Sequence, residues 1–201
     1  MHGGADENSL SKTENVPAIE KGIVNLMRHC SNVRKFGVPC VVAINTFPND
    51  TEVELQALES ACAKNGIKAV RATHHKDGGR GAKQLAEEVV SLASQPSNFK
   101  LLYPNEMPLV DKIRTIAIEI YGAADVSFEP AALATLKKWQ TDGYGHFPVC
   151  MAKNQYSFSA NPKALGAPSG HTVPVRSVRL SAGAEFIVVL TGVLHLVVLV
   201  A

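Results

Sequence analysis

The sequence predicts an α/β fold in which a parallel-sheet βαβ unit with flanking helices is followed by a smaller, mixed α+β part. The first observation is a set of continuous apolar runs of strand length, such as CVVAI at 40–44, which are typical of strands buried on both faces. The second is that a segment with helix start and stop signals separates two such runs. The third is a change after Gly145, where short strand-like pieces replace helical spacing.

The first part of the chain alternates helices and strands in the order that a parallel sheet requires. Helical spacing of apolar residues predicts the first helix, which we expect Gly37 to end. Asp50 or Thr51 is expected to cap the second helix, and Asn65–Gly66 to stop it. The predicted elements are a helix at 16–35, a strand at 39–45, a helix at 50–66, a strand at 67–73 and, after a loop, a helix that ends near 95.

The second part begins with a pair of helices and continues with strands. We predict helices at 107–122 and 129–145 and strands at 147–152, 171–181 and 185–190. The apolar run at 185–201 favours two buried strands around a Thr191–Gly192 turn. A short membrane anchor and a segment without settled structure are the alternatives, because the run falls short of the ~18 apolar residues of a membrane helix. We expect domains at 1–104 and 105–201.

Composition narrows the classes of partner and compartment. The 201 residues carry a net charge of +2, with basic and acidic side chains spread along the chain, so we expect neither a nucleic acid nor a membrane as partner. Four cysteines, Cys30, Cys40, Cys62 and Cys150, show no C-x-x-C spacing and favour a reduced compartment. The N-terminal residues lack the apolar segment of a signal peptide. We therefore expect a cytoplasmic protein, with an organelle left open.

Polar and aromatic residues follow two of the predicted strands. The first loop offers Asn45, Phe47 and Asp50, and the second offers His74–His75 and the glycines Gly78 and Gly79. Because ligands bind beyond the carboxyl ends of strands in open parallel sheets, we expect both loops on one rim. Rings, an amide and a carboxylate together suit a planar heterocycle.

Each of these residues also has a structural interpretation. Phe47 suits a core anchor as well as it suits a ligand contact, and Asp50 favours a helix cap over acid–base chemistry. His74–His75 lacks further ligands at zinc spacing, so we predict no metal site. The glycines of GGRG at 78–81 favour a helix entry over a phosphate cradle, because no Lys-Ser or Lys-Thr follows them.

A second polar cluster follows the predicted strand at 147–152. Lys153, Gln155 and Tyr156 come directly after it, with two serines beyond. Such a set is typical either of the rim of a site or of a sheet edge whose polar groups are satisfied, and the sequence leaves the two interpretations open.

Several long motifs resemble the formate–tetrahydrofolate ligase family, also called 10-formyltetrahydrofolate synthetases. The motifs are MHGG, VVAINTFPNDTEVE, HHKDGGRGAKQLA, FPVCMAKNQYSFS and GAPSGHTVPVRSVRLSAGAEFIVVLTG, and they cover roughly residues 1–192. The resemblance implies an ATP-dependent ligase of one-carbon metabolism. ATP and Mg²⁺ would serve formyl phosphate formation, and the tetrahydrofolate amine would then attack the formyl carbon. It further implies that Phe47 and Pro48 contact the pterin and that His75 occupies the place of a stacking Trp.

The sequence also departs from the family pattern. The family's glycine-rich phosphate loop precedes MHGG and is absent, Glu185 stands where most members have Gly, and the residues after Gly192 differ. We therefore expect a C-terminal portion of the family chain, truncated at both ends and inactive alone, and we assign it no catalytic residue. The alternatives are a non-catalytic folate-binding module or one that pairs with a full-length subunit or with itself, and a membrane-tethered protein.

Overall fold

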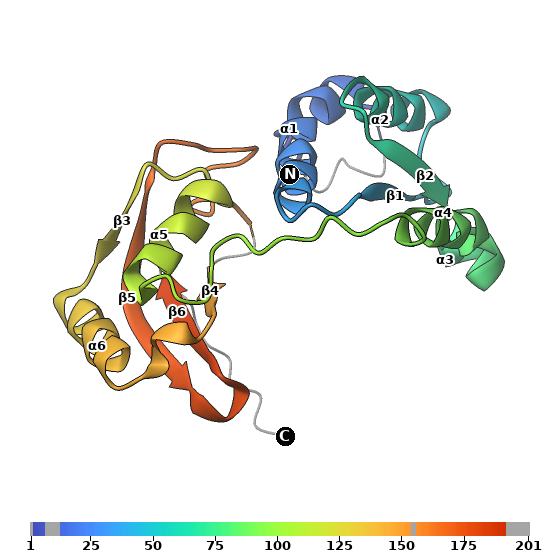
Figure 1. Ribbon diagram of the computed structural model, residues 1–201. Helices are drawn as coiled ribbons and strands as arrows, with labels where there is room; N and C mark the ends of the chain where they lie inside the picture. The colour runs from blue at the N-terminus through green and yellow to red at the C-terminus, as the bar shows by residue number, and fades with distance from the viewer. Residues whose placement is uncertain (1, 7–12, 154–155, 192–201) are drawn as a thin grey trace. The chain divides into compact units, whose positions relative to one another are not determined.

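The computed structural model describes residues 2–6, 13–153 and 156–191 and divides into two compact units, residues 1–100 and 101–201 (Figure 1). These are called unit 1 and unit 2. Within the described ranges, no helix has both the length and the apolar character needed to cross a bilayer.

Unit 1 contains the predicted βαβ unit, which is confirmed. Strands β1 and β2 pair in parallel, with Val41 opposite Lys68 and Asn45 opposite Ala72. Residues 74–82, expected as a loop, instead form two short helices, α3 and η2. The elements are α1 (Val16–Lys35), β1 (Val41–Asn45), α2 (Glu52–Lys64), β2 (Lys68–Ala72), α3 (His74–Asp77), η2 (Gly78–Ala82) and α4 (Lys83–Ala93).

Local signals fix where the helices of unit 1 begin and end. The Asn15 side chain accepts a hydrogen bond from the Ala18 N–H at the start of α1. Thr51 and Glu54 form a reciprocal capping box at the start of α2. Past the end of α1, Gly37 has a φ of 71°, and a Cβ there would lie 1.9 Å from the Asn98 carbonyl oxygen. Glycine is therefore required at this position by both backbone conformation and packing.

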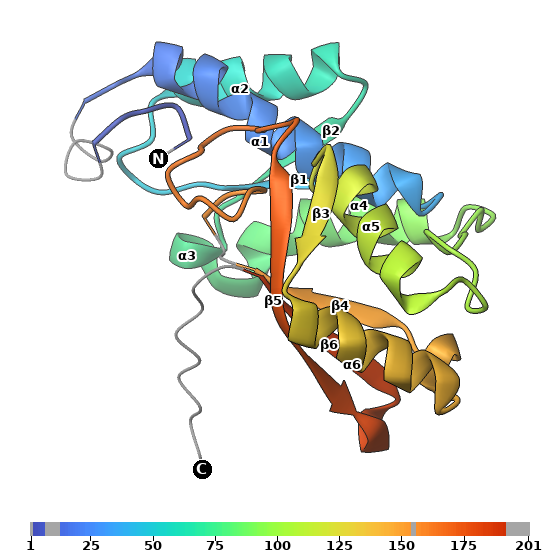
Figure 2. The same cartoon turned by 90° about the vertical axis from the view of Figure 1, so that its left-hand side faces the viewer.

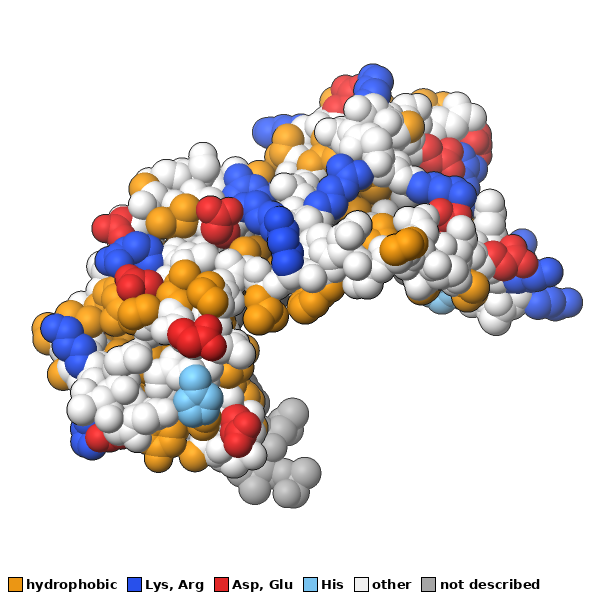
Figure 3. Space-filling model, in the orientation of Figure 1, with side chains coloured by type: hydrophobic (Ala, Val, Ile, Leu, Met, Phe, Trp, Pro, Cys, Tyr) orange, Lys and Arg blue, Asp and Glu red, His pale blue; other side chains and the backbone are white. Residues whose placement is uncertain are grey.

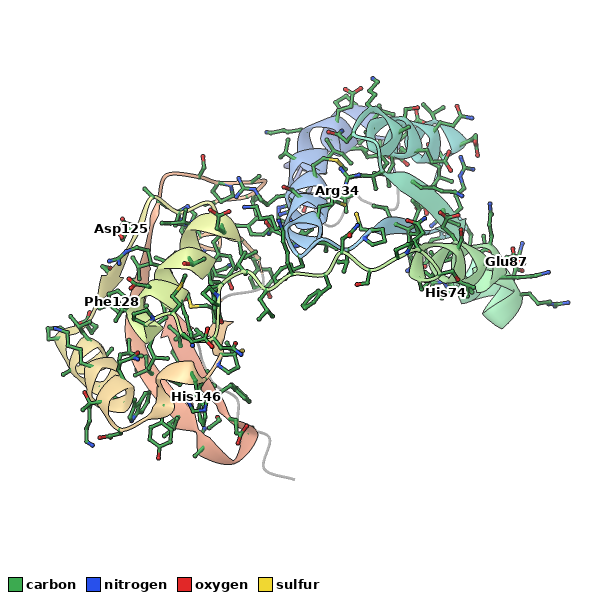
Figure 4. All side chains as sticks on the ribbon, viewed as in Figure 1. Arg34, His74, Glu87, Asp125, Phe128 and His146 are labelled. Carbon is green, nitrogen blue, oxygen red and sulfur yellow. The ribbon has the colours of Figure 1, made fainter. Side chains whose placement is uncertain are left out.

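The core of unit 1 is small, and charged contacts supplement it. Its buried residues are Cys30, Val42, Ile44, Leu55, Cys62 and Ile67. Arg34, labelled in Figure 4, reaches from α1 to the Asn65 and Gly66 carbonyls at the end of α2, at 3.4 and 2.6 Å. The Arg71 guanidinium binds the carboxylates of Glu52 and Glu59 at 2.7 Å each.

Unit 2 contains a four-stranded mixed sheet in the order β3-β5-β6-β4 (Figure 2). The β3–β5 and β4–β6 pairs are parallel, and β5 and β6 form an antiparallel hairpin with a bulge between Val175 and Ser177. The elements are α5 (Leu109–Glu119), β3 (Asp125–Phe128), α6 (Pro130–Thr141), η3 (Tyr144–His146), β4 (Val149–Ala152), β5 (Thr172–Ser181), η4 (Ala182–Ala184) and β6 (Phe186–Thr191).

The core of unit 2 lies between the two helices and one face of the sheet. Residues buried from both helices and from three strands make it up: Leu109, Ile113, Ala117, Ala123, Val126, Ala132, Leu136, Phe147, Val173, Val175, Ile187 and Val189. The Lys112 side chain is fully buried beside this core, where its Nζ donates to the carbonyls of Gly145 and Phe147 at 2.7 and 3.0 Å. These bonds replace the water that the buried amine loses, and the charge of Glu106 also favours its protonated form.

Two features of unit 2 bear on the sequence predictions. Strand β3 was not expected, because it is only four residues long, a single residue separates it from α6, and its partner β5 lies far along the chain. Glu185, at the β5–β6 connection, has a φ of 54° and is the sole non-glycine residue with positive φ in the described ranges. Strand β6 confirms the first of the two strands predicted near the C-terminus, while the predicted turn and second strand fall in 192–201, outside the described residues.

Candidate functional site

The carboxyl ends of β1 and β2 bring the two predicted loops together. The Thr46 N–H donates to the Ala72 carbonyl at 3.0 Å and so extends the parallel pairing by one residue. Just beyond, the rings of Phe47 and His75 are 5.1 Å apart between centroids, with an interplanar angle of 54°. Phe47 is 43% exposed and takes no part in the core of unit 1. The structure thus places this ring at the rim, and the core-anchor interpretation was wrong.

The first loop is a closed turn that presents Phe47. The Phe47 N–H donates to Oδ2 of Asp50 at 2.7 Å, and the Asp50 N–H donates back to the Phe47 carbonyl at 3.1 Å. The expectation that Asp50 caps α2 was wrong, because Thr51 is the cap and Asp50 holds the turn. With Asp50 engaged in this way, the backbone that carries Phe47 and the exposed Pro48 is fixed.

The second loop is held by Thr73 and Asp77, which the sequence analysis did not single out. The Thr73 hydroxyl and an Asp77 carboxylate oxygen lie 2.7 Å apart, and the Thr73 N–H donates to the Gly81 carbonyl at 3.0 Å. A Cβ at Gly81 would lie 2.5 Å from the Thr73 carbonyl carbon, so this glycine serves chain packing. Cβ atoms at Gly78 and Gly79 would meet nothing within 4 Å, so both positions are open.

The arrangement can hold a flat ligand if the two rings separate. A planar ring inserted between them needs about 3.5 Å on each side, hence a separation of about 7 Å. The present 5.1 Å spacing is a direct ring contact, so a ligand must displace one ring. Asn45, at the end of β1, and His74, labelled in Figure 4 at the start of α3, are both exposed and offer polar groups at the same edge of the sheet.

The predicted cluster after β4 belongs to unit 2. Lys153 is half-buried, with its Nζ 5.4 Å from the centre of the Tyr121 ring and 3.4 Å from the Ser159 carbonyl. Burial lowers the pKa of Lys153 to about 8, and it raises the pKa of Tyr121. Tyr156 is 45% exposed, and Gln155 lies outside the described residues.

The two serines of this cluster serve the local turn. The Ser157 hydroxyl donates to the Ala164 carbonyl at 2.5 Å and accepts from the Ser159 N–H at 3.0 Å. The Ser159 hydroxyl likewise bonds to the carbonyl and N–H of Asn161. For the serines, these bonds favour the interpretation as a satisfied edge, while the Lys153 amine keeps a distinct, partly desolvated environment.

Features outside the two predicted loops and the cluster after β4 do not add a further candidate site among the described residues. A cavity of about 320 Å³ in unit 1 is lined by Gly37, Val38, Pro39 and Val41 together with residues of α4 and of the segment that follows it, and it includes none of the predicted site residues. Basic and acidic side chains are interspersed on the face shown in Figure 3. No group of three or more His, Cys, Asp or Glu side chains suited to a metal ion occurs at 2–6, 13–153 or 156–191.

Comparison with known proteins gives a consistent result over nearly the whole sequence. A family model described as formate–tetrahydrofolate ligase matches residues 1–197. Formate–tetrahydrofolate ligases of Granulibacter bethesdensis and Paracoccus denitrificans are each 54% identical to this chain, over 193 and 192 residues, and that of Maricaulis maris is 55% identical over 193. Each alignment covers 96% of this chain and 34% of the relative, so the chain spans about a third of the length of these relatives.

Proposed function

Because this chain belongs to the formate–tetrahydrofolate ligase family, we propose that it carries part of the tetrahydrofolate site of a ligase that forms 10-formyltetrahydrofolate in one-carbon metabolism. The observation that supports the proposal is the pair of rings on the rim of the parallel sheet. Phe47 is an exposed aromatic side chain on a fixed turn, and His75 from the adjacent loop contacts it. Exposed rings at the carboxyl edge of a sheet match the needs of a flat pterin.

In the proposed site the residues of this chain bind and orient the folate. The family reaction consumes ATP and formate and passes through formyl phosphate, whose formyl carbon the folate amine attacks as phosphate leaves. Phe47 and His75 would enclose the pterin, and Pro48 would extend the apolar surface beside it. Asn45 and His74 would offer hydrogen bonds at its edge. Holding the amine in one orientation lowers the entropic part of the barrier to attack.

The residues present do not fit ATP and Mg²⁺, the family's co-substrates. The glycines at 78–81 are followed by Ala82 and Lys83, not by the Lys-Ser or Lys-Thr of a phosphate loop, and two of them face open space. The described part of the chain also lacks a cluster of carboxylates suited to a metal ion. We therefore assign no contact with ATP or Mg²⁺ to the residues that the structure describes.

Isothermal titration of the purified chain with tetrahydrofolate tests the site. We expect Phe47→Ala to weaken binding by about tenfold, since a lost aromatic contact is worth about 0.5–1.5 kcal/mol beyond area. His75→Trp should strengthen binding, because indole offers a larger apolar face than imidazole. Val90→Ala is the matched control, since Val90 is 65% exposed on α4 and is also truncated to Ala. Absence of binding at millimolar folate, or equal effects of Phe47→Ala and Val90→Ala, would contradict the proposed site.

A separate assay addresses catalysis. We expect the purified 201-residue chain to show no turnover with ATP, Mg²⁺, formate and tetrahydrofolate, because phosphoryl transfer needs a phosphate cradle and a metal-bound nucleotide. The control is an Asp50→Ala, Phe47→Ala double variant. Turnover by the unmodified chain above that of this control would show that the 201-residue chain suffices for the reaction, and the proposal that it only binds and orients the folate would then be wrong.

Assembly and compartment stay predictions. The expected homo-oligomer, or pairing with a full-length subunit, is checked by light scattering on the chain alone and after mixing with a full-length ligase. The expected cytoplasmic location is checked by cell fractionation.

A further inference from the structure

Three of the four cysteines converge in the core of unit 1. Cys30 comes from α1, Cys40 directly precedes β1, and Cys62 comes from α2. Cys30 and Cys62 are buried members of one apolar cluster, and Cys40 packs against it. All three are free thiols. Neither the family comparison nor the rim site gives this cluster a role.

Two of these thiols are neighbours. Cys40 packs against the buried cluster that contains Cys30, and the Cys40 side chain is among the groups that raise the Cys30 pKa, through its charge and a hydrogen bond. The contact bridges two elements, the C-terminal half of α1 and the residue that leads into β1. A disulfide between neighbouring thiols requires a suitable separation of the Cα atoms and convergent Cβ directions, which peptide mapping tests directly.

The two thiols differ in access. Cys30 is 6% exposed, whereas Cys40 is partly exposed and is reached by solvent. Burial, and then the neighbouring Cys40, raise the pKa of Cys30 to about 11, so Cys30 is held as a thiol. An oxidant in solution therefore meets Cys40 first.

We propose that Cys40 and Cys30 are a peroxide-oxidised pair, in which Cys40 is attacked from solvent and Cys30 resolves the product as a disulfide. In the first step the Cys40 sulfur attacks one oxygen of hydrogen peroxide, the O–O bond breaks, and Cys40 sulfenic acid and water form. In the second step the Cys30 sulfur attacks the Cys40 sulfur, the S–O bond breaks, and hydroxide leaves with the Cys30 proton as water. The two thiols together lose two electrons, and the peroxide gains them.

Cys30 is favoured over the other cysteines as the resolving partner. Cys62 is 0% exposed, and among the causes of the Cys30 pKa shift it contributes only a charge effect, whereas Cys40 also contributes a hydrogen bond. Cys150 lies in unit 2 and is exposed, so it is open to oxidation by itself. The Cys30–Cys40 bond would tie α1 to the start of β1, at the opposite end of the strand from Phe47. The tie should therefore stabilise unit 1 and leave folate binding unchanged.

Peptide mapping under non-reducing conditions tests the proposal. The chain carrying Cys150→Ser, which prevents links through unit 2, is treated with hydrogen peroxide, digested and analysed by mass spectrometry. We expect a cross-linked peptide pair containing Cys30 and Cys40, with the mass loss of two hydrogens, that dithiothreitol reverses. The treated chain should also melt at a higher temperature than the reduced chain.

Variants distinguish the pair from general oxidation. Adding Cys30→Ser should abolish the cross-link and leave Cys40 as a sulfenic acid that dimedone traps, whereas Cys62→Ser should leave the cross-link intact. Circular dichroism shows whether each variant is folded. The chain that carries only Cys150→Ser keeps all its core cysteines, so its cross-link tests the proposal even if a core variant does not fold. A Cys40–Cys62 link, or a Cys40 that accumulates as sulfinic acid with Cys30 still reduced, would overturn the proposal. Complete resistance of Cys40 to peroxide would overturn it as well.

Discussion

The two units of the chain are stabilised in different ways. Among the described residues, unit 2 packs its helices on a four-stranded sheet over a cluster of 12 buried apolar residues, whereas unit 1 has a two-stranded sheet and a cluster of six. A two-stranded sheet is marginal in isolation, so unit 1 depends more on helix caps and on ion pairs such as those of Arg71. Unit 2 instead satisfies even a buried amine, that of Lys112, with backbone carbonyls.

The difference bears on function because the aromatic rim lies in unit 1. Phe47 and His75 stand on loops at the edge of the smaller core, where few neighbours oppose a change of ring position. Sites that must open for a ligand are drawn from the less stable parts of a protein. Unit 1 therefore combines the lower expected stability with the residues that we expect to move.

The largest expected effect comes from truncating matched core leucines. Leu136→Ala in unit 2, at a side chain with 0% exposure, should cost about 3 kcal/mol of unfolding free energy, because the enclosed cavity cannot collapse. Leu55→Ala in unit 1, at 8% exposure, should cost less, about 2 kcal/mol. Urea titration followed by circular dichroism measures both.

The chain offers a probe that separates the two units. Its single tryptophan, Trp139, packs against the core of unit 2, so its fluorescence reports that unit alone. We expect Leu136→Ala to move the fluorescence transition and Leu55→Ala to move mainly the circular dichroism transition. If Leu55→Ala shifts both transitions equally, the units unfold together and the contrast between them fails.

A smaller effect is expected from left-handed backbone positions. Glu185 in unit 2 has a φ of 54°. Glu185→Gly should stabilise the protein by about 0.5–1 kcal/mol, because it relieves backbone strain that exceeds the extra conformational entropy of glycine in the unfolded chain. Gly66 in unit 1 has a φ of 63° with open space around it, and Gly66→Ala should destabilise by a similar amount. Thermal melts of the two variants measure the shifts, and a melting temperature lowered by Glu185→Gly would contradict the strain.

A further set of effects concerns pH, at opposite ends of the pH scale for the two units. In unit 2 the pKa of Lys153 is lowered from 10.5 to about 8, so the folded state binds fewer protons than the unfolded state between these values. Stability should therefore rise from about pH 8 to pH 10, and Lys112, whose pKa burial also lowers, acts in the same direction. Lys153→Met should reduce this rise in melts followed by Trp139 fluorescence. The raised pKa of Tyr121 opposes the rise above pH 10.

In unit 1 the corresponding group is a carboxylate. Hydrogen bonds from Arg71, and then from Gln56, lower the pKa of Glu52 from 4.5 to about 2. The contribution of Glu52 is present above pH 4.5 and is lost as pH falls toward 2. Arg71→Gln should flatten this acid loss in circular dichroism melts. An unchanged acid profile in Arg71→Gln would show that solvent screens the pair completely.

Local sequence signals predicted most helices and strands because those signals act over short distances. The apolar spacing and Gly37 placed α1, and the capping residues Thr51 and Glu54 placed α2. Strand β3 was missed because four residues carry too little pattern, and its stability comes from pairing with β5. Helix α3 was missed because it depends on the Thr73–Asp77 hydrogen bond within a loop.

The candidate site was predictable in position but not in detail. The order of strands placed the loops after β1 and β2 on one edge, which the parallel pairing explains. Spacing alone did not show that Asp50 closes its own turn, since both a cap and a turn use a short carboxylate at that point. The close approach of Cys30 and Cys40 likewise depends on tertiary packing, because no C-x-x-C spacing announces it.

The fully buried amine of Lys112 has a consequence for protease digestion. Trypsin must draw a lysine side chain into its own pocket, and Lys112 lies near the start of α5 with its Nζ bound to two carbonyls. Cleavage after Lys112 therefore requires that α5 leave the sheet, whereas cleavage after Lys100, which is exposed and lies outside the helices and strands, does not require a helix to open. The rate of tryptic cleavage after Lys112 would thus report how often α5 separates from the sheet of unit 2.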